Sequence, residues 1–298
     1  MASTRMQEFS ARIRANRAAN PHGNDVLASR ASMEAEMAKL RLPDDIERED
    51  VTVAGRPARW SRSPNARRDR ALLYLHGGAY VRGSLDTHAE LMGRLARATS
   101  MPVLGLDYRL APEHPYPAAL TDAVAAYREL LESGLTPGQI LIGGDSAGGG
   151  LAAATLLAIK EAGLTQPAGA ILLSPWADLS GSGDSVQSRA EADPMVDATS
   201  LAVMARHYLG DTPAETPGAS PIFGQFDGIA PLLIQVGDAE VLLDDAIRLQ
   251  QRAAAAGVDS SLRIFDGGFH VFQAIPALPE AAEALADVAD FCQRVISE

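Results

Sequence analysis

One serine of the chain lies in a setting that could make it a nucleophile. Ser146 is the centre of the stretch Gly144-Asp-Ser-Ala-Gly148, between a short apolar run, Ile140–Ile142, and a segment of helical periodicity, 147–162. The glycines permit a sharp turn that larger residues would block. A glycine-rich turn alone would show the same five residues, but their place between strand and helix is that of a nucleophile elbow. The context therefore favours a catalytic Ser146.

A second glycine-rich motif indicates where the charge of a tetrahedral intermediate would be bound. His-Gly-Gly-Ala-Tyr follows another apolar run, Ala71–Leu75. In the hydrolase fold with this elbow, backbone N–H groups of such a loop and of the residue after the nucleophile stabilise the oxyanion. The candidate donors are Gly77, Gly78, Ala79 and Ala147. His76 precedes the serine and is expected to brace the loop.

A serine hydroxyl needs a base, and in this fold the order along the chain is serine, acid, histidine. Only His207 and His270 follow Ser146. His207 lies in a segment without strand character. His270 lies in a glycine-rich loop directly after the last predicted strand, Leu262–Phe265, and so can reach an elbow serine. We predict His270 as the base.

Four carboxylates compete for the role of the acid after the predicted strand Leu232–Val236. Asp244 and Asp245 fall within the next predicted helix, where we expect them to face solvent or partners in a cap. Asp238 and Glu240 both stand close to the end of the strand. Either could orient the imidazole and stabilise the imidazolium.

Strands and helices alternate over most of the chain. Short apolar runs, also present at Val103–Leu106 and Ala170–Leu173, alternate with amphipathic segments, which predicts an α/β fold with a mostly parallel central sheet flanked by helices. Val51–Val53 and Ala58–Ser61 are expected to form a hairpin. The interval 178–218 shows no strand pattern and is predicted to be a helical cap inserted into the core.

These motifs, with Asp107-Tyr-Arg-Leu-Ala-Pro-Glu-His-Pro-Tyr-Pro117, resemble the hormone-sensitive-lipase-like branch of the α/β-hydrolases, in particular its bacterial (family IV) esterases. The resemblance runs from about residue 70 to the C-terminus. It implies a serine carboxylesterase that acts on short- to medium-chain esters, about two to eight acyl carbons, in a capped pocket. Laying the family's Asp-Pro-Leu-x-Asp-Glu pattern on this chain favours Glu240 over Asp238 as the acid. Many members have a third glycine where this chain has Ala79.

The pattern of strands and helices along the sequence suggests a division of the chain. Residues 1–47 are expected to be N-terminal cap helices, 48–177 the first part of the catalytic core, 178–218 the cap insertion, and 219–298 the second part of the core. The polar residues after the second strand of the core are expected to form a buried network. They are Asp107, Arg109, Glu113 and His114.

Composition limits the remaining functions. The net charge of −12 disfavours nucleic-acid partners, and no long apolar window or apolar leader indicates a membrane span or secretion, so we expect a cytoplasmic protein. The single cysteine, Cys292, is expected to be buried and inert. No metal or other cofactor is expected, and the partner is a small-molecule ester.

Two other functions stay open at this point. A lactone hydrolase would use the same groups, and some proteins of this branch are receptors that bind small molecules without hydrolysing them. A homodimer through Leu262–Phe265 and Ala281–Val295 is a further expectation from the resemblance.

Overall fold

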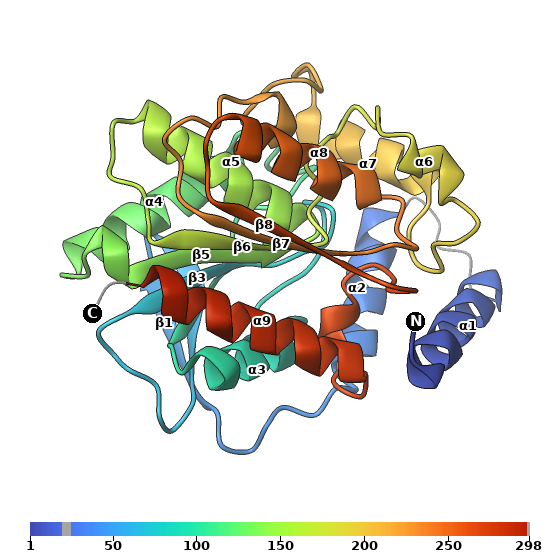
Figure 1. Cartoon of the computed structure of the whole chain (residues 1–298), viewed down its shortest axis with the longest axis horizontal. Coiled ribbons are helices and arrows are strands. Elements are labelled where there is room, and N and C mark those ends of the chain that lie inside the picture. The colour runs from blue at the N-terminus through green and yellow to red at the C-terminus, as the bar shows by residue number, and fades with distance from the viewer. Residues whose placement is uncertain (20–24, 297–298) are drawn as a thin grey trace.

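Eight strands form a single sheet in the computed structural model, which describes residues 1–19 and 25–296 (Figure 1). The strands are β1 (Glu47–Val53), β2 (Arg56–Arg62), β3 (Ala71–Leu75), β4 (Val103–Leu106), β5 (Ile140–Asp145), β6 (Gly169–Leu173), β7 (Leu232–Gly237) and β8 (Ser260–Phe265). Their order is β1-β2-β4-β3-β5-β6-β7-β8. The β1–β2 and β2–β4 pairs are antiparallel, whereas the pairs from β4 to β8 are parallel. The predicted hairpin and mostly parallel sheet are confirmed.

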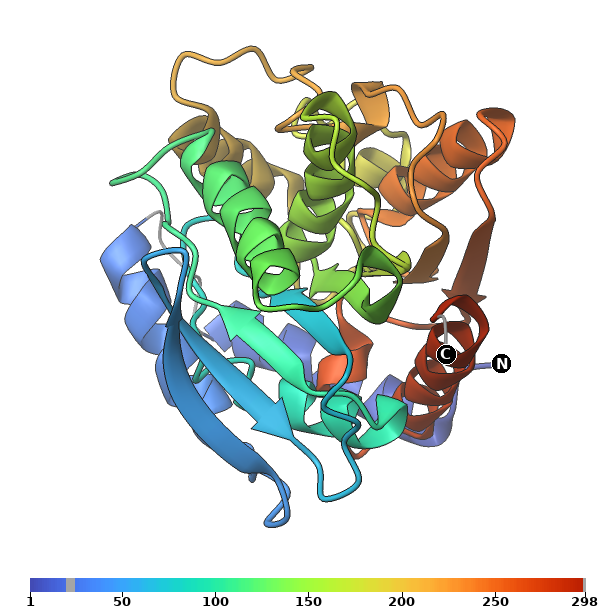
Figure 2. The same ribbon diagram turned by 90° about the vertical axis from the view of Figure 1, so that its left-hand side faces the viewer.

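Helices cover both faces of the sheet. They are α1 (Thr4–Ala19), α2 (Val26–Met37), α3 (Ala89–Thr99), α4 (Ala118–Glu132), α5 (Ala147–Glu161), α6 (Ser185–Ser188), α7 (Ala198–Leu209), α8 (Leu243–Ala255) and α9 (Pro279–Val295). Short 3₁₀ turns occur at Pro137–Gln139, Pro221–Phe223 and Phe272–Ala274. Helices α4, α5 and α8 pack on one face, and α3 and α9 pack on the other (Figures 1 and 2).

The central strands are apolar along their whole length because both faces are covered. Every residue of β3 is buried, and successive side chains alternate between two core clusters. Leu73 and Leu75 pack under α4 and α5, while Leu72 and Tyr74 pack against α3 and α9. This alternation follows from the two-residue period of a strand. The carboxyl ends of the parallel strands are thereby held rigidly at one edge of the sheet.

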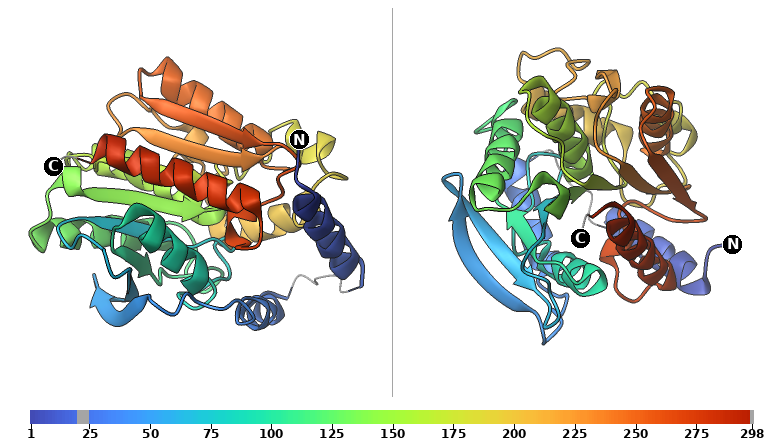
Figure 3. Two further views of the ribbon diagram at one scale, coloured as in Figure 1. Left: turned by 60° about the horizontal axis from the view of Figure 1, so that its bottom comes forward. Right: turned by 60° about the vertical axis from the view of Figure 1, so that its left-hand side comes forward.

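The first two helices and the interval 178–218 gather at that edge (Figure 3). The interval holds α6 and α7, and the predicted cap helices of residues 1–47 correspond to α1 and α2. Residues 20–24 of that prediction lie outside the described residues. Arg17 of α1 forms an ion pair with Asp197, the N-cap residue of α7, at 2.9 Å. Helix α1 and the interval 178–218 are therefore in direct contact.

Three local features of the helices bear on the fold, namely the start of α3, the burial of Cys292 and the length of the apolar helices. Helix α3 begins only at Ala89, because the Ser84 hydroxyl accepts the amides of Asp86 and Thr87 and holds a turn before it. Cys292 is buried in α9, as predicted, and burial raises the pKa of its thiol to about 12. No helix within residues 1–19 and 25–296 is long and apolar enough to cross a membrane.

Candidate active site

Ser146 lies in the tight turn between β5 and α5. Its backbone angles are φ 53° and ψ −121°, a conformation that costs on the order of 1–3 kcal/mol for a residue with a side chain. The Ser146 amide donates to the Leu173 carbonyl at 2.8 Å, and the Trp176 amide donates to the Ser146 carbonyl at 2.9 Å. The neighbouring strand and loop thus hold the strained turn in place, as a nucleophile elbow requires.

Two glycines make this turn possible. A Cβ at Gly148 would lie 1.9 Å from the carbonyl oxygen of Leu75, and a Cβ at Gly144 would lie 2.4 Å from the same oxygen. Any side chain at either position would collide with the end of β3. The glycines of the motif are therefore required by the close approach of β3 to the elbow, and they bring the loop after β3 next to Ser146.

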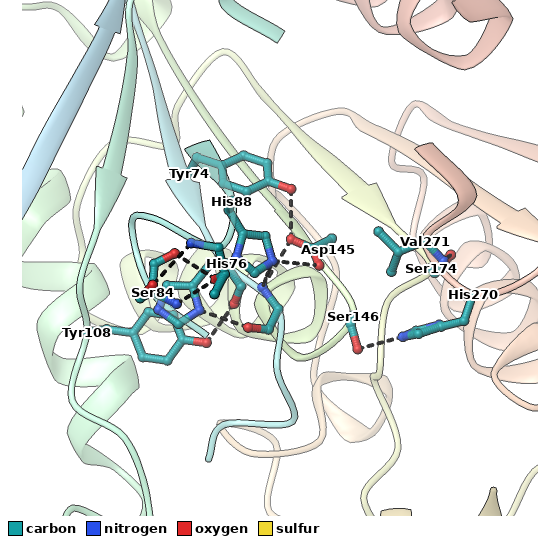
Figure 4. Close-up of polar contacts among 12 residues, drawn as sticks. Tyr74, His76, Ser84, His88, Tyr108, Asp145, Ser146, Ser174, His270 and Val271 are labelled. Atoms are coloured by element: carbon teal, nitrogen blue, oxygen red, sulfur yellow. Dashed lines mark hydrogen bonds and ion pairs between the residues drawn. The ribbon is translucent and has the colours of Figure 1, made fainter. Parts of the chain in front are cut away.

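The structure brings together Ser146, His270 and Glu240. His270 Nε2 lies 2.8 Å from Ser146 Oγ, and His270 Nδ1 lies 2.8 Å from Glu240 Oε2 (Figure 4 shows the serine–histidine contact). The serine comes from the end of β5, the glutamate from the loop after β7 and the histidine from the loop after β8. His207 lies on α7 and is not among the residues that line the pocket around Ser146.

Two donors fix the carboxylate of Glu240. Its Oε1 accepts the amide of Gly237 at 2.6 Å and the hydroxyl of Ser174 at 2.7 Å. Ser174 Oγ in turn accepts the amide of Val271, next to His270, at 3.1 Å. Ser174 was not found by the sequence reasoning, because a serine after β6 carries no motif of its own. It connects the acid to the loop that carries the histidine.

Asp238, the other candidate acid, has a different position. Its Oδ1 accepts the amide of Gly267 at 2.7 Å and so supports the glycine-rich turn before His270. The carboxylate that contacts the imidazole belongs to Glu240.

Glu240 raises the pKa of His270. Burial lowers the pKa of His270, but the hydrogen bond and the charge of Glu240 outweigh burial and hold its pKa above the ordinary 6.5. With Nδ1–H donated to Glu240, the neutral ring presents the lone pair of Nε2 to Ser146. The arrangement can remove a proton from Ser146 Oγ.

The loop after β3 places backbone amides beside Ser146. Gly78 has φ 122° and Ala79 has φ 56°, and both line the pocket with Ser146. Within residues 1–19 and 25–296 the amides of Gly78, Ala79 and Ala147 donate to no protein acceptor. Gly77 differs, because its amide donates to Asp145 Oδ1 at 3.0 Å. We therefore withdraw Gly77 as an oxyanion donor and assign it to the support of the loop.

Behind this loop lies a buried polar cluster that sequence reasoning missed. Asp145 Oδ1 accepts the Tyr74 hydroxyl at 2.8 Å as well as the Gly77 amide, and Asp145 Oδ2 lies 3.4 Å from His88 Nε2 (Figure 4). Burial acts to raise the pKa of Asp145, but His88 and Tyr74 outweigh burial and lower it. The sequence offered one indication of this cluster, which is that Asp145 lies inside the elbow motif, next to Ser146.

His76 braces the loop, as its position in the motif suggested. Its Nδ1 lies 2.8 Å from the Gly77 carbonyl, and its ring stacks on Tyr108 with centroids 4.3 Å apart. Tyr108 also donates its hydroxyl to the His76 carbonyl at 2.6 Å. Burial, together with the charge of His88, lowers the pKa of His76 to about 3, so its ring is neutral.

The predicted buried network after β4 is wrong for two of its members. Glu113 and His114 are exposed, and Glu113 pairs with Arg30 of α2 at 2.7 Å. Asp107 and Arg109 are half-buried, and Arg109 pairs with Asp122 at 2.6 Å. The segment runs over the surface on its way to α4, so its charges find partners there.

The two aspartates of α8, Asp244 and Asp245, lie in different environments. Asp244 accepts the amide of Ser185, in the interval 178–218, at 2.8 Å. Asp245 does not face solvent but is buried, and its Oδ2 accepts the amides of Ala177 and Asp178, at the start of the interval 178–218, at 2.8 Å each. Burial raises the pKa of Asp245 to about 8. It fastens the start of the interval 178–218 to helix α8.

A cavity of about 750 Å³ opens above Ser146. Its floor includes Ser146 and His270, and its walls come from α1, α2, the interval 190–204 and the loop after β3. The apolar part of the wall includes Met33, Met37, Leu201 and Met204. The cavity therefore reaches from the serine to the surrounding helices and is large enough for a small organic substrate.

Comparison with known proteins agrees with the class that this fold and site define. The sequence profile of the alpha/beta hydrolase fold family matches residues 72–274, and the chain belongs to that family. Within it, the chain is a member of the hormone-sensitive-lipase-like group. It is 44% identical to an esterase from the bacterial hormone-sensitive lipase family of solved structure, with a TM-score of 0.96 and 100% of each chain covered.

Characterised relatives carry names of the same kind. An acetyl-hydrolase of Streptomyces hygroscopicus is 46% identical over 250 residues, which is 83% of each chain. An esterase of Acinetobacter venetianus is 41% identical over 223 residues, covering 74% of this chain and 73% of its own.

Proposed function

We propose that the protein is a serine carboxylesterase that hydrolyses short- to medium-chain esters through an acyl-enzyme intermediate. The comparisons give the class, a carboxylic ester hydrolase. The observation that carries the finer proposal is the unbroken hydrogen-bonded series from Ser146 through His270 to Glu240 at the floor of a cavity.

The first half of the reaction forms the acyl-enzyme. Ser146 Oγ attacks the ester carbonyl carbon while its proton passes to His270 Nε2. The carbonyl π electrons move to oxygen, and the amides of Gly78, Ala79 and Ala147 stabilise the resulting oxyanion. As the carbonyl re-forms, the alkoxide leaves and takes the proton from Nε2. Glu240 stabilises the imidazolium throughout.

The second half releases the acid. A water molecule attacks the acyl carbon and gives its proton to Nε2. The second oxyanion collapses, Ser146 Oγ departs with that proton, and the carboxylic acid leaves. Because a lactone is a cyclic ester, the same groups would open a lactone ring.

The cavity supports the substrate range. It is bounded by the N-terminal helices and the cap, and its volume of about 750 Å³ suits a small ester better than a long-chain glyceride. We expect the highest kcat/KM for acyl chains of about two to eight carbons.

The test is turnover of 4-nitrophenyl esters from acetate to palmitate by the wild type and by Ser146→Ala. We expect loss of activity on the order of 10⁴-fold or more in Ser146→Ala, with an unchanged melting temperature. Ser133→Ala, at an exposed position that ends α4, is the matched control and should keep full activity. A folded wild type that hydrolyses no ester would contradict the proposal, and equal or better turnover of palmitate would contradict the substrate range.

A further inference from the structure

One cation in the ester pocket has no acidic partner. Arg82 lines the cavity, and its Nη1 donates to the hydroxyl of Ser29 on α2. Its Nε is buried and has no acceptor among residues 1–19 and 25–296, and no carboxylate in that part of the chain pairs with it. An arginine stays charged in proteins, and a buried charge is costly unless it is paired. A guanidinium that is bonded to a hydroxyl and to no carboxylate therefore requires an explanation.

Arg82 is fixed to the loop that carries the oxyanion donors. The Gly78 carbonyl accepts the amide of Arg82 at 3.0 Å, and a Cβ at Gly78 would lie 3.1 Å from Arg82 Cγ. The stem of the side chain thus packs against Gly78 while its head reaches Ser29. Both ends line the same cavity as Ser146.

The other two arginines of the cavity are already engaged. Arg14 donates to the Ala192 carbonyl at 2.9 Å, and Arg17 pairs with Asp197 at 2.9 Å. Both reach from α1 to the cap and so hold these two elements together. Arg82 makes no such link.

The acids of the cavity are engaged as well. Asp145 accepts from Tyr74 and Gly77, and Asp193 accepts three backbone amides, those of Met195, Val196 and Val241, at 2.8 to 3.0 Å. Glu191 is exposed to solvent. Protein donors other than Arg82 meet the charges of Asp145 and Asp193, and Glu191 faces solvent, so an anion that enters the cavity would find the guanidinium available.

We propose that Arg82 forms a subsite for a carboxylate carried by the substrate, so that the preferred esters are those with an anionic group on the acyl or the alcohol part. This inference rests on the proposed esterase function. A guanidinium presents parallel N–H donors that match a carboxylate, and such charge-assisted pairs are the stronger hydrogen bonds. An uncharged ester would offer the guanidinium no anionic partner.

Two matched pairs of esters test the subsite. On the acyl side, mono-4-nitrophenyl adipate is compared with 4-nitrophenyl hexanoate, with the spontaneous rate subtracted. On the alcohol side, 5-carboxypentyl butyrate is compared with hexyl butyrate by titration of released acid. The variants are Arg82→Met, which keeps the apolar stem, Arg82→Lys, which keeps the charge, and Arg128→Met, an exposed control on α4.

We expect Arg82→Met to lower kcat/KM for the charged ester of at least one pair by about 10- to 100-fold, mainly through KM, since hydrogen bonds to charged groups are worth about 1.5–3 kcal/mol. The neutral ester should change by less than about threefold, and Arg82→Lys should keep part of the effect. A charged-to-neutral ratio that is the same in wild type and Arg82→Met for both pairs would overturn the subsite.

A binding measurement separates this outcome from failure of the esterase proposal. Adipate binding to Ser146→Ala, followed by calorimetry, needs no turnover. Binding that disappears in the Ser146→Ala/Arg82→Met double variant supports the subsite even if no ester is hydrolysed. Binding that is equally strong in both, or absent in both, counts against it.

Discussion

Two buried histidine–carboxylate pairs flank Ser146, and they have different surroundings. In the first, His270 Nδ1 lies 2.8 Å from Glu240 and Nε2 faces the Ser146 hydroxyl. In the second, His88 Nε2 lies 3.4 Å from Asp145 and Nδ1 lies 2.8 Å from the Thr87 hydroxyl. In both, burial lowers the pKa of the histidine, but the carboxylate outweighs burial and the pKa is raised.

The difference shows that a histidine beside a carboxylate is not a general base for that reason alone, because the partner of its second ring nitrogen also matters. His270 has its second nitrogen on the nucleophile at the floor of the cavity. Both nitrogens of His88 are taken up by protein groups, and its carboxylate partner holds the Gly77 amide at 3.0 Å. The first pair is therefore placed to move a proton, whereas the second holds the backbone of the loop after β3, through Gly77, in a fixed position.

The largest expected effect separates the two histidines. His270→Gln should lower kcat by on the order of 10⁴-fold or more, since no group remains to take the Ser146 proton. His88→Gln should lower kcat by about 10- to 100-fold, because the amides of Gly78 and Ala79 are displaced but present. Steady-state turnover of 4-nitrophenyl butyrate by both variants measures this. Equal losses in the two variants would contradict the distinction.

A smaller effect is expected for the acid. Glu240 Oε1 accepts from both Gly237 and Ser174, so in Glu240→Gln the amide oxygen must stay there and the NH₂ group must face His270. The ring is then forced to accept at Nδ1 and to carry its proton on Nε2, the wrong tautomer for a base. We expect kcat to fall by on the order of 10³- to 10⁴-fold.

The pH profile and a neighbouring acid sharpen this test. The base acts only when neutral, so activity of the wild type should rise with pH through the raised pKa of His270. Loss of the Glu240 charge in Glu240→Gln should lower the pKa of His270, so the rise of activity should move to lower pH. Asp238→Asn is the control: its carbonyl can still accept the Gly267 amide, and activity should stay within about threefold. A large loss in Asp238→Asn would mean that the supporting turn, and not Glu240 alone, sets the histidine.

The contrast between the pairs also explains what the sequence could predict. The parallel sheet follows from uniformly apolar strands, and the candidates Ser146 and His270 follow from motifs directly after strands, where positions are rigid. Asp145 and His88 are 57 positions apart in number and meet only because β3 and β5 are neighbours in the sheet. Such tertiary contacts, like those of Ser174 with Glu240, leave no local pattern. The ion pair of Glu113 with Arg30 of α2 is another such contact.

The smallest expected effect concerns stability and belongs to the second pair. The pKa of His88 is raised from 6.5, so its contribution is complete below that value and is lost as pH rises through the folded-state pKa. The pKa of Asp145 is lowered from 3.8, so its contribution is present above that value and is lost as pH falls through the folded-state pKa. The pair should therefore stabilise the fold most between those two ordinary values.

The melting-temperature difference between wild type and His88→Gln should accordingly be larger near pH 5.5 than near pH 9, by a few degrees, about 2–4 °C for each kcal/mol. Taking the difference removes groups that titrate equally in both proteins. His114→Gln, at an exposed position, should melt with the wild type at both pH values. A His88→Gln difference that is independent of pH would mean that the ring supports the oxyanion loop by packing and neutral hydrogen bonds, without the charge that the raised pKa implies.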